Sequence, residues 1–330
     1  MPLGKPVADT ERSSFFRLTV TLLAWITLWV SPALGEPITI VSHPVPLDEH
    51  APESTTVGAL RYRGGLSLTS THRDFGGLSG LRVSADGLTL HAVTDGGMFL
   101  TARLSYDSSG VLRGVTDADL SRLPETGRTP RDGDAEALSE DGSGGWIVAF
   151  EQRHRLMRMD DGKSPIGNIP LPSKASGLPP NSGIEALTRL PDGQLLILAE
   201  HPAATGKHPG WLDGDGGCRE LSYVPGVNFS PTDATTLPSG DILVLERAFS
   251  LFGGWGARIV HVAREQVMAG AEIRGQSLAL FRAPLIVDNF EGLAARSVPG
   301  NFRIYILSDD NFNFLQRTLL LTFDWPELQP

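Results

Sequence analysis

The sequence "GIEALTRLPDGQLLILAE", residues 183–200, contains most of the information that decides the fold. A largely apolar run ends at Leu190, and the turn sequence "PDG" follows it. In such a turn proline fixes φ, and glycine accepts a positive φ. A second apolar run, "LLILA", then ends at an acid, Glu200. Two short apolar runs around a turn of this kind predict a β-hairpin.

Four further stretches share this plan of a small or polar start, a turn containing glycine, and an apolar run that leads into an acid. They are "GLSGLRVSADGLTLHAVTD" (77–95), "DAEALSEDGSGGWIVAFE" (134–151), "PTDATTLPSGDILVLE" (231–246) and "NFEGLAARSVPGNFRIYILSD" (289–309). The corresponding residues Ser79, Glu136, Glu185, Asp233 and Glu291 are 57, 49, 48 and 58 positions apart. A hairpin repeat near 50 residues is typical of a four-stranded propeller blade.

The length of the chain then predicts how many blades there are and how the ring closes. The chain after residue 35 holds about six units of this period, so the sequence predicts an all-β, six-bladed β-propeller. Five blades carry the motif, and the sixth would be assembled from "LRYRGGLSLTS" (60–70) and "TLLLTF" (318–323). Pairing of these N- and C-terminal strands would remove an open sheet edge. A pair of β-sandwiches is the structural alternative.

The repeated acids are the first candidate site. The first strand of a propeller blade lines the central channel, so we expect Glu136, Glu185, Asp233 and Glu291 to converge with Ser79 near one axis. Carboxylates held this close repel one another unless a cation is present. Ca²⁺, which takes six to eight oxygen ligands, suits such a ring. A second set of acids ends the hairpins: Asp95, Glu151, Glu200, Glu246 and Asp309. Alternatively, the acids bond backbone amides and hold the blades in register.

A loop near the end of the chain, "SDDNFNF" (308–314), is the second candidate. It offers two carboxylates, Asp309 and Asp310, and the amides of Asn311, Asn313 and Gln316, all of which carry hard oxygen donors suited to Ca²⁺. In an extended loop, Phe312 and Phe314 would point to the same side. The alternative is a network of Asx turns that fixes the closing strand.

The net charge and the N-terminal segment indicate which partners the protein binds and in which compartment it is located. The formal net charge is −10 and no basic run is present, which argues against nucleic acid and anionic membrane surfaces as partners. Arg12 and Arg17 precede an apolar run, residues 18–30. Residues 1–35 are therefore predicted to be a signal peptide, residues 36–330 a single domain, and the protein periplasmic or secreted. An uncleaved N-terminal anchor is the alternative, although the run is shorter than the roughly 20 residues of a membrane span.

Several stretches together resemble a known family, the phytase-like proteins described by "esterase-like activity of phytase". The most specific of them are "NSGIEAL" (181–187), "DNFEGLA" (288–294) and "SDDNFNFLQRTLLL" (308–321). The resemblance runs in order from about residue 61 to residue 323. It implies an exported bacterial propeller, and the family name implies hydrolysis of phosphoesters or esters.

The leading hypothesis is a Ca²⁺-dependent phosphoesterase or esterase acting on a small molecule at an acidic channel. The predicted metal ligands are Glu136, Glu185, Asp233, Glu291, Asp309 and Asp310. The predicted catalytic residues are Glu185, Glu291 and Asp310, and the predicted substrate-binding residues are Arg153, Arg247, Asn311 and Arg317. The metal would act as a Lewis acid and activate water, and the arginines would clamp a phosphate. Two alternatives remain open: a non-enzymatic propeller that binds a ligand or partner, and a lactonase-like hydrolase.

Overall fold

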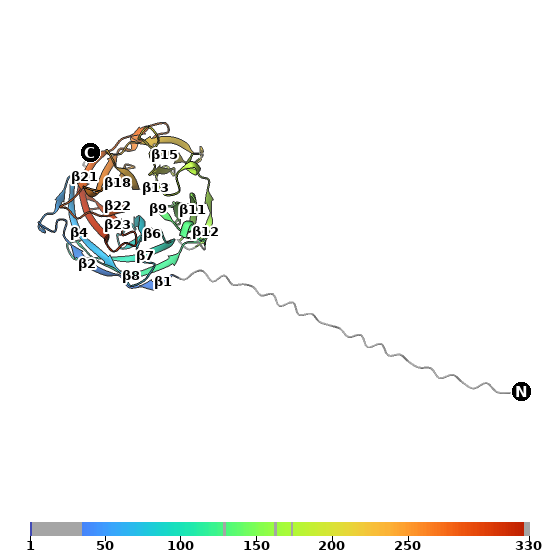
Figure 1. Ribbon diagram of the computed structural model, residues 1–330, viewed down its shortest axis with the longest axis horizontal. Helices are drawn as coiled ribbons and strands as arrows, with labels where there is room; N and C mark the ends of the chain where they lie inside the picture. The colour runs from blue at the N-terminus through green and yellow to red at the C-terminus, as the bar shows by residue number, and fades with distance from the viewer. Residues whose placement is uncertain (2–34, 128–129, 162–163, 173, 327–330) are drawn as a thin grey trace. The chain divides into compact units, whose positions relative to one another are not determined.

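The computed structural model describes Met1 and residues 35–127, 130–161, 164–172 and 174–326. Residues 36–326 form a β-propeller of five blades, seen along its axis in Figure 1. The predicted signal peptide falls almost entirely on residues outside the described ranges.

Each blade is an antiparallel sheet whose innermost strand lies at the ring centre. Blade 1 runs outward through β5 (Leu78–Val83), β6 (Thr89–Thr94), β7 (Met98–Tyr106) and β8 (Leu112–Arg122). Blade 2 contains β9 (Ala135–Glu140), β10 (Trp146–Phe150), β11 (Arg155–Asp160) and β12 (Ser164–Ile169). Blade 3 contains β13 (Ile184–Arg189), β14 (Leu195–Ala199), β15 (His208–Asp213) and β16 (Arg219–Tyr223), with the short β20 (Glu272–Ile273) parallel to β16.

The last two blades complete the ring. Blade 4 contains β17 (Ser230–Thr236), β18 (Ile242–Ser250), β19 (Gly254–Val262) and β21 (Gln276–Phe281). Blade 5 contains β22 (Asn289–Val298), β23 (Asn301–Asp309), β24 (Thr318–Pro326) and β4 (Leu60–Thr69). Three short 3-10 helices lie in connections: Pro130–Asp132, Ala175–Gly177 and Arg264–Gln266.

The prediction of six blades was wrong. Strands β24 and β4 do not form a blade of their own, because β24 pairs with β23 on one side and with β4 on the other. They are the third and fourth strands of the blade that the last hairpin motif begins. Residues 36–57 add β1 (Glu36–Ile38) to blade 1 and β2 (Val41–Val45) and β3 (Thr56–Val57) to blade 5, so this stretch forms no further blade. The predicted pairing of N- and C-terminal strands is present.

The hydrophobic core is divided among the blade interfaces. Five clusters of buried apolar side chains fill the spaces between neighbouring blades, one for each interface. At the closing seam, for example, Leu66 of β4 and Leu320 of β24 pack with Leu81 and Leu104 of blade 1. The nearly continuous apolar runs of the repeated hairpins, such as β10 and β14, are buried on both faces and so supply side chains to the interfaces on both sides of a blade. The inner strands β5, β9, β13, β17 and β22 pack side by side around the axis.

Candidate functional site

Every inner strand carries a β-bulge at the same place in the repeat. The register shifts fall at Gly80 in β5, Glu136 in β9, Glu185 in β13, Thr232 in β17 and Glu291 in β22, each of which is an extra residue without a partner on the next strand. A bulge redirects the side chain of the extra residue and is often found beside a functional site. Three of the five bulge residues are glutamates. The sheet geometry therefore presents Glu136, Glu185 and Glu291 in equivalent positions.

A second set of polar side chains comes from the strand next to each inner strand. Glu151 and Glu200 donate their backbone N–H groups to the carbonyls of Asp134 and Gly183, two residues before the bulges of blades 2 and 3. Asp309 of blade 5 pairs in the same way with Asn289. In blade 4 the equivalent position, opposite Ser230, is Arg247. This arginine therefore takes a place in the ring that is acidic in three other blades.

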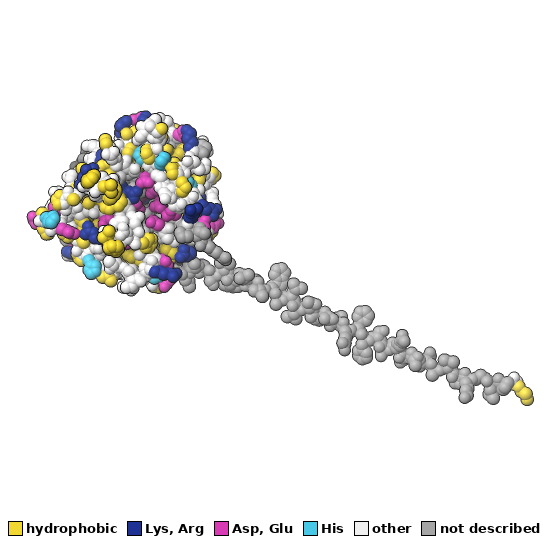
Figure 2. Space-filling model, in the orientation of Figure 1, with side chains coloured by type: hydrophobic (Ala, Val, Ile, Leu, Met, Phe, Trp, Pro, Cys, Tyr) yellow, Lys and Arg dark blue, Asp and Glu magenta, His cyan; other side chains and the backbone are white. Residues whose placement is uncertain are grey.

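The carboxylates lie close enough to perturb one another. Burial, followed by the charges of Glu291 and Asp134, raises the pKa of Asp95 to about 8. Burial, with Glu291 and Asp95 next, raises the pKa of Asp309 to about 9. Desolvation also raises the pKa values of Glu136 and Glu185 well above their usual range, and neighbouring carboxylates add to it. Acidic side chains gather at the middle of the ring on the face shown in Figure 2. The site strongly favours protons or cations.

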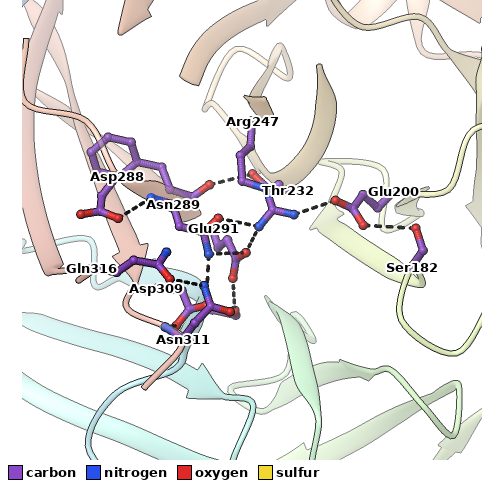
Figure 3. A network of polar contacts seen from close by, with 12 residues as sticks. Ser182, Glu200, Thr232, Arg247, Asp288, Asn289, Glu291, Asp309, Asn311 and Gln316 are labelled. Atoms are coloured by element: carbon purple, nitrogen blue, oxygen red, sulfur yellow. Dashed lines mark hydrogen bonds and ion pairs between the residues drawn. The ribbon is translucent and has the colours of Figure 1, made fainter. Parts of the chain in front are cut away.

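Arg247 is hydrogen-bonded on both sides by acids (Figure 3). Its Nη2 donates to Oε1 of Glu200 at 2.6 Å, and its Nη1 donates to Oδ1 of Asn289 at 2.7 Å and to Oε1 of Glu291. Asn289 in turn donates to Glu291 at 3.0 Å and to Oδ2 of Asp309 at 3.1 Å. Ser79 donates its hydroxyl to Oε2 of Glu291 at 2.8 Å. Glu291 is thus held in one orientation by three donors from three blades.

One part of the acidic cluster has the donor set of a cation site. Carboxylate oxygens of Asp95, Asp134 and Glu136 lie within 4.8 Å of one another. Oδ1 of Asp95 is buried and has no hydrogen-bond partner. A buried carboxylate oxygen without a partner is costly unless an ion or water satisfies it. The residues present therefore fit a hard divalent cation, for which carboxylate oxygens are the preferred ligands.

Asp233 lies on the channel axis but away from this group. Its Oδ2 accepts hydrogen bonds from the backbone N–H groups of Leu293 at 2.8 Å and Leu81 at 3.2 Å, and pairs with Nη1 of Arg82 at 3.2 Å. Arg82 comes from β5 and donates to Leu187 of β13, a strand that is not its neighbour in the ring. The guanidinium therefore reaches across the channel.

The Arg82–Asp233 pair links inner strands across the channel. Arg82 donates to the carbonyl oxygens of Ala234 and Leu293, both at 3.0 Å, so it joins the inner strands of four blades. The mouth of the channel opposite the acidic cluster contains a cavity of about 600 Å³. It is lined by Arg82 and by residues at the C-terminal ends of the inner strands. Asp233 is completely buried. Its contacts are those of a residue that holds the blades in register.

The loop after β23 is tightly turned. Asn311 and Phe312 have positive φ values of 48° and 49°, so the loop is not extended. Phe312 lies against Gly76 and Gly77 of blade 1 and is about half exposed, whereas Phe314 is 93 % exposed. The two rings therefore do not share one buried side. Asn311 donates to Oε1 of Gln316 at 3.2 Å.

Asp310 holds this loop in place. Its Oδ1 accepts hydrogen bonds from the backbone N–H groups of Gly77 at 3.0 Å and Phe312 at 3.1 Å. Its Oδ2 accepts one from the hydroxyl of Thr318, at 3.0 Å, on the closing strand. These hydrogen bonds tie the loop to blade 1 and to β24, which is the arrangement expected for an Asx-turn network that fixes the closing strand.

Replacing Asp310 with asparagine should therefore affect stability more than ligand binding. The loss of charge-assisted hydrogen bonds is expected to lower the free energy of unfolding by about 1–2 kcal/mol, measured by urea denaturation. Calcium affinity, measured by calorimetry, should stay within about twofold, a difference under 0.5 kcal/mol. Asp215→Asn, at an exposed loop position, is the matched control. Unchanged stability together with lost calcium affinity would instead place Asp310 among the cation ligands.

The remaining predicted residues lie outside the acidic cluster. Arg153 is largely exposed and pairs with Asp132 at 2.7 Å. Arg317 pairs with Glu49 at 3.1 Å and is near Asp288. Glu246, predicted to belong to the second set of acids, accepts hydrogen bonds from the Tyr223 hydroxyl at 2.7 Å and from Arg258 at 2.9 Å.

The structure adds two acids, Asp95 and Asp134, to the predicted ligand set. It also brings Glu151 close enough to raise the pKa values of Asp95 and Glu136 by its charge. Asp95 and Glu151 end hairpins in the repeat, so the pattern already contained a signal for them. Asp134 precedes the bulge of β9 by two residues, and "DAE" (134–136) places it on the same side of an extended chain as Glu136.

The fold and the site define a class of protein: a five-bladed propeller whose channel is acidic at one mouth and bridged by an arginine–aspartate pair. The chain belongs to the phytase-like family, described as "esterase-like activity of phytase", whose model matches residues 73–312. This confirms the resemblance noted in the sequence. Among the described residues, no helix is long and apolar enough to cross a membrane.

Solved structures give a more distant likeness. A catalytically inactive virginiamycin B lyase from Staphylococcus aureus with quinupristin is 11% identical, with 82% of this chain and 81% of that chain covered and a TM-score of 0.40. The β-propeller domain of Cps50 (Swd1) from Myceliophteria thermophila is 9% identical, with 86% and 99% covered and a TM-score of 0.40. A comparison with curated protein sequences found no match.

Proposed function

We propose that the protein is an exported hydrolase of phosphoesters or carboxylic esters that holds divalent cations, Ca²⁺ in the first place, at the acidic mouth of its channel. The observation that carries this proposal is the orphaned carboxylate oxygen of Asp95 beside Asp134 and Glu136. The family description supports the choice of ester chemistry. The predicted signal peptide supports a periplasmic or secreted location.

Asp95, Asp134 and Glu136 would hold one cation. Asp309 and Glu151 lie close enough to this group to act electrostatically on it. A bound divalent cation supplies Lewis acidity toward the ester oxygens and lowers the pKa of a bound water. Several carboxylates sharing one region would then be ionised at neutral pH, because the cation offsets their repulsion.

Glu185 is the candidate general acid and base. It is a bulge residue, buried, and hydrogen-bonded to Glu151, and burial raises its pKa well above the usual range. A raised carboxyl pKa is one way in which proteins adapt an acidic side chain to acid–base catalysis. In hydrolysis, the oxygen of water bonds to phosphorus or to the carbonyl carbon, the ester bond breaks, and the leaving oxygen takes up a proton. Glu185 would move that proton.

Glu291 and Arg247 would position the substrate rather than transfer protons. Arg247 is already paired with Glu200 and Glu291, so its charge balances the acids around it. Asn289 and Ser79 fix Glu291 from opposite sides. These hydrogen bonds fix the side chains before a ligand binds. Less conformational entropy is therefore lost on binding.

The test is hydrolysis of 4-nitrophenyl phosphate, 4-nitrophenyl acetate and a δ-lactone by the purified protein, before and after chelation and with Ca²⁺ restored. Activity on the phosphate or the acetate should disappear with chelator and return with Ca²⁺. Glu185→Gln should lower kcat by about 10²–10³-fold, the scale of general acid–base catalysis. Glu140→Gln, at the exposed far end of β9, is the matched control and should leave kcat unchanged.

Other outcomes decide between the alternatives. Hydrolysis of the lactone alone would assign the lactonase-like reaction to the same site. Calcium binding without hydrolysis of any of the three would indicate a non-enzymatic binding propeller. Activity that is unaffected by chelator and by Glu185→Gln would overturn the proposed site.

A further inference from the structure

A second cavity opens beside the acidic cluster, in the angle between blade 4 and the loop after β23. It has a volume of about 290 Å³, and its lining includes Glu200, Arg247, Asn289, Asn311, Phe249 and Trp255. Four of these residues, Glu200, Arg247, Asn289 and Asn311, belong to the hydrogen-bond network drawn in Figure 3. A molecule in the cavity would therefore touch the same side chains that border the proposed reaction site.

One wall of the cavity is aromatic. Phe249 of β18 and Trp255 of β19 face each other across the hairpin, with ring centroids 4.7 Å apart and planes inclined by 52°. Phe249 is 58% exposed although it is a large apolar side chain. Leu251 and Phe252 at the tip of the same hairpin are also exposed, and hydrophobic side chains lie close to the acidic centre in Figure 2. An apolar wall next to polar groups is the usual composition of a small-molecule site.

The polar side of the cavity does not suit a strongly anionic ligand. Among the described residues that line it, Arg247 is the one cation, and both of its terminal nitrogens already donate to carboxylates. Its Cζ also lies 5.9 Å from the centroid of the Trp255 ring. A second phosphate group placed here would meet Glu200 and an arginine that is already neutralised. An uncharged ring would meet Phe249 and Trp255 instead.

From this arrangement we infer that the cavity binds a planar aromatic group, so that the substrates of the site are aryl esters rather than molecules with many phosphates. The inference rests on the proposed hydrolase function, because it assigns the group that lies next to the reacting ester. The volume suits one or two fused rings, since a closed apolar cavity of about 150 Å³ is known to hold benzene. Stacking between the ligand ring and Trp255 would make the site prefer esters that carry an aromatic ring.

The test combines a binding measurement that needs no catalysis with a comparison of two substrates. Calorimetric titration with 1-naphthol should show binding to the wild-type protein. Trp255→Ala should weaken that binding by about tenfold, the scale of a lost aromatic contact, and Trp255→Phe should largely restore it. Phe314→Ala, which removes an aromatic ring that is 93 % exposed and does not line the cavity, is the matched control and should bind 1-naphthol as the wild type does.

The kinetic arm uses 1-naphthyl phosphate and ethyl phosphate with the Ca²⁺-loaded protein. Trp255→Ala should raise KM for the naphthyl ester by about tenfold and leave KM for the ethyl ester unchanged, because only the former places a ring in the cavity. Equal effects on both esters, or unaltered 1-naphthol binding by Trp255→Ala, would overturn the inference. Binding of 1-naphthol that depends on Trp255 in a protein that hydrolyses neither ester would support the aromatic site and refute the hydrolase function. Hydrolysis of the esters without 1-naphthol binding would support the hydrolase function and refute the aromatic site.

Discussion

Asp233→Ala should lower the free energy of unfolding by about 3–5 kcal/mol, as expected when one partner of a buried ion pair is removed. The carboxylate is completely buried, pairs with Arg82 and accepts two backbone N–H groups from blades 1 and 5. Without it, the charge of Arg82 remains on the channel axis and both N–H groups lose their acceptor. Urea denaturation at pH 8 measures the change, since Asp233 has a pKa raised by burial to about 6 and is ionised there.

The double variant Arg82→Met with Asp233→Leu separates the cost of an unpaired charge from the loss of packing. It should be less destabilised than Asp233→Ala, because no charge is left buried. Asp192→Ala removes a partner of the partly exposed Asp192–Arg264 pair and should change stability by less than about 1 kcal/mol. If Asp233→Ala were as stable as Asp192→Ala, the axial pair would contribute nothing to joining the blades.

The second large effect concerns pH. The metal-free protein should lose stability steadily as the pH rises from about 5 to about 9. Burial raises the pKa of Asp95 to about 8 and that of Asp309 to about 9, whereas in the unfolded chain both titrate near their ordinary value of 3.8. Between these limits the folded protein holds protons that the unfolded chain has released. The free energy of unfolding then falls with pH, by about 1.4 kcal/mol per pH unit for each such proton.

Saturating Ca²⁺ should flatten this pH profile and raise it most at high pH, because the cation replaces the protons. At a hundred times the dissociation constant it adds about 2.7 kcal/mol. Thermal melting between pH 5 and pH 9, with chelator and with Ca²⁺, measures both effects. Asp95→Asn removes one of the titrating groups, so its metal-free profile should be shallower. A metal-free protein whose stability rises over this range would contradict the arrangement of the acids.

The sequence predicted the hairpins and the ring because turn residues and apolar alternation are local signals. It did not predict the bulges, and their effect on the site is large. The pattern aligned Ser79 and Asp233 with the three glutamates, yet the extra residues in those blades are Gly80 and Thr232. In a strand, a shift of one residue moves a side chain to the opposite face. Asp233 therefore points toward Arg82 and away from the acidic cluster, whereas the Ser79 hydroxyl still reaches Glu291.

The same shift explains blade 4. The pattern placed Glu246 in the second set of acids, but Arg247 occupies the equivalent position and Glu246 turns toward Tyr223 and Arg258. The shape of the loop after β23 could be predicted only in part, because the turn at Asp310 is local but the hydrogen bond from Gly77 to Asp310 joins residues more than 230 positions apart. Long-range contacts of this kind have no local signature.

The closing seam has a consequence for how the chain acquires its structure. Strand β4 (Leu60–Thr69) is synthesised long before its partner β24 (Thr318–Pro326), because almost the whole ring lies between them in the chain. Until that last strand emerges, β4 has an unpaired edge and the apolar faces beside it have no cover. Any shorter nascent chain is therefore an open ring that can pair with another copy. Blade 1 can complete its own sheet early, whereas blade 5 and its interface with blade 1 are completed only when β24 pairs with β4.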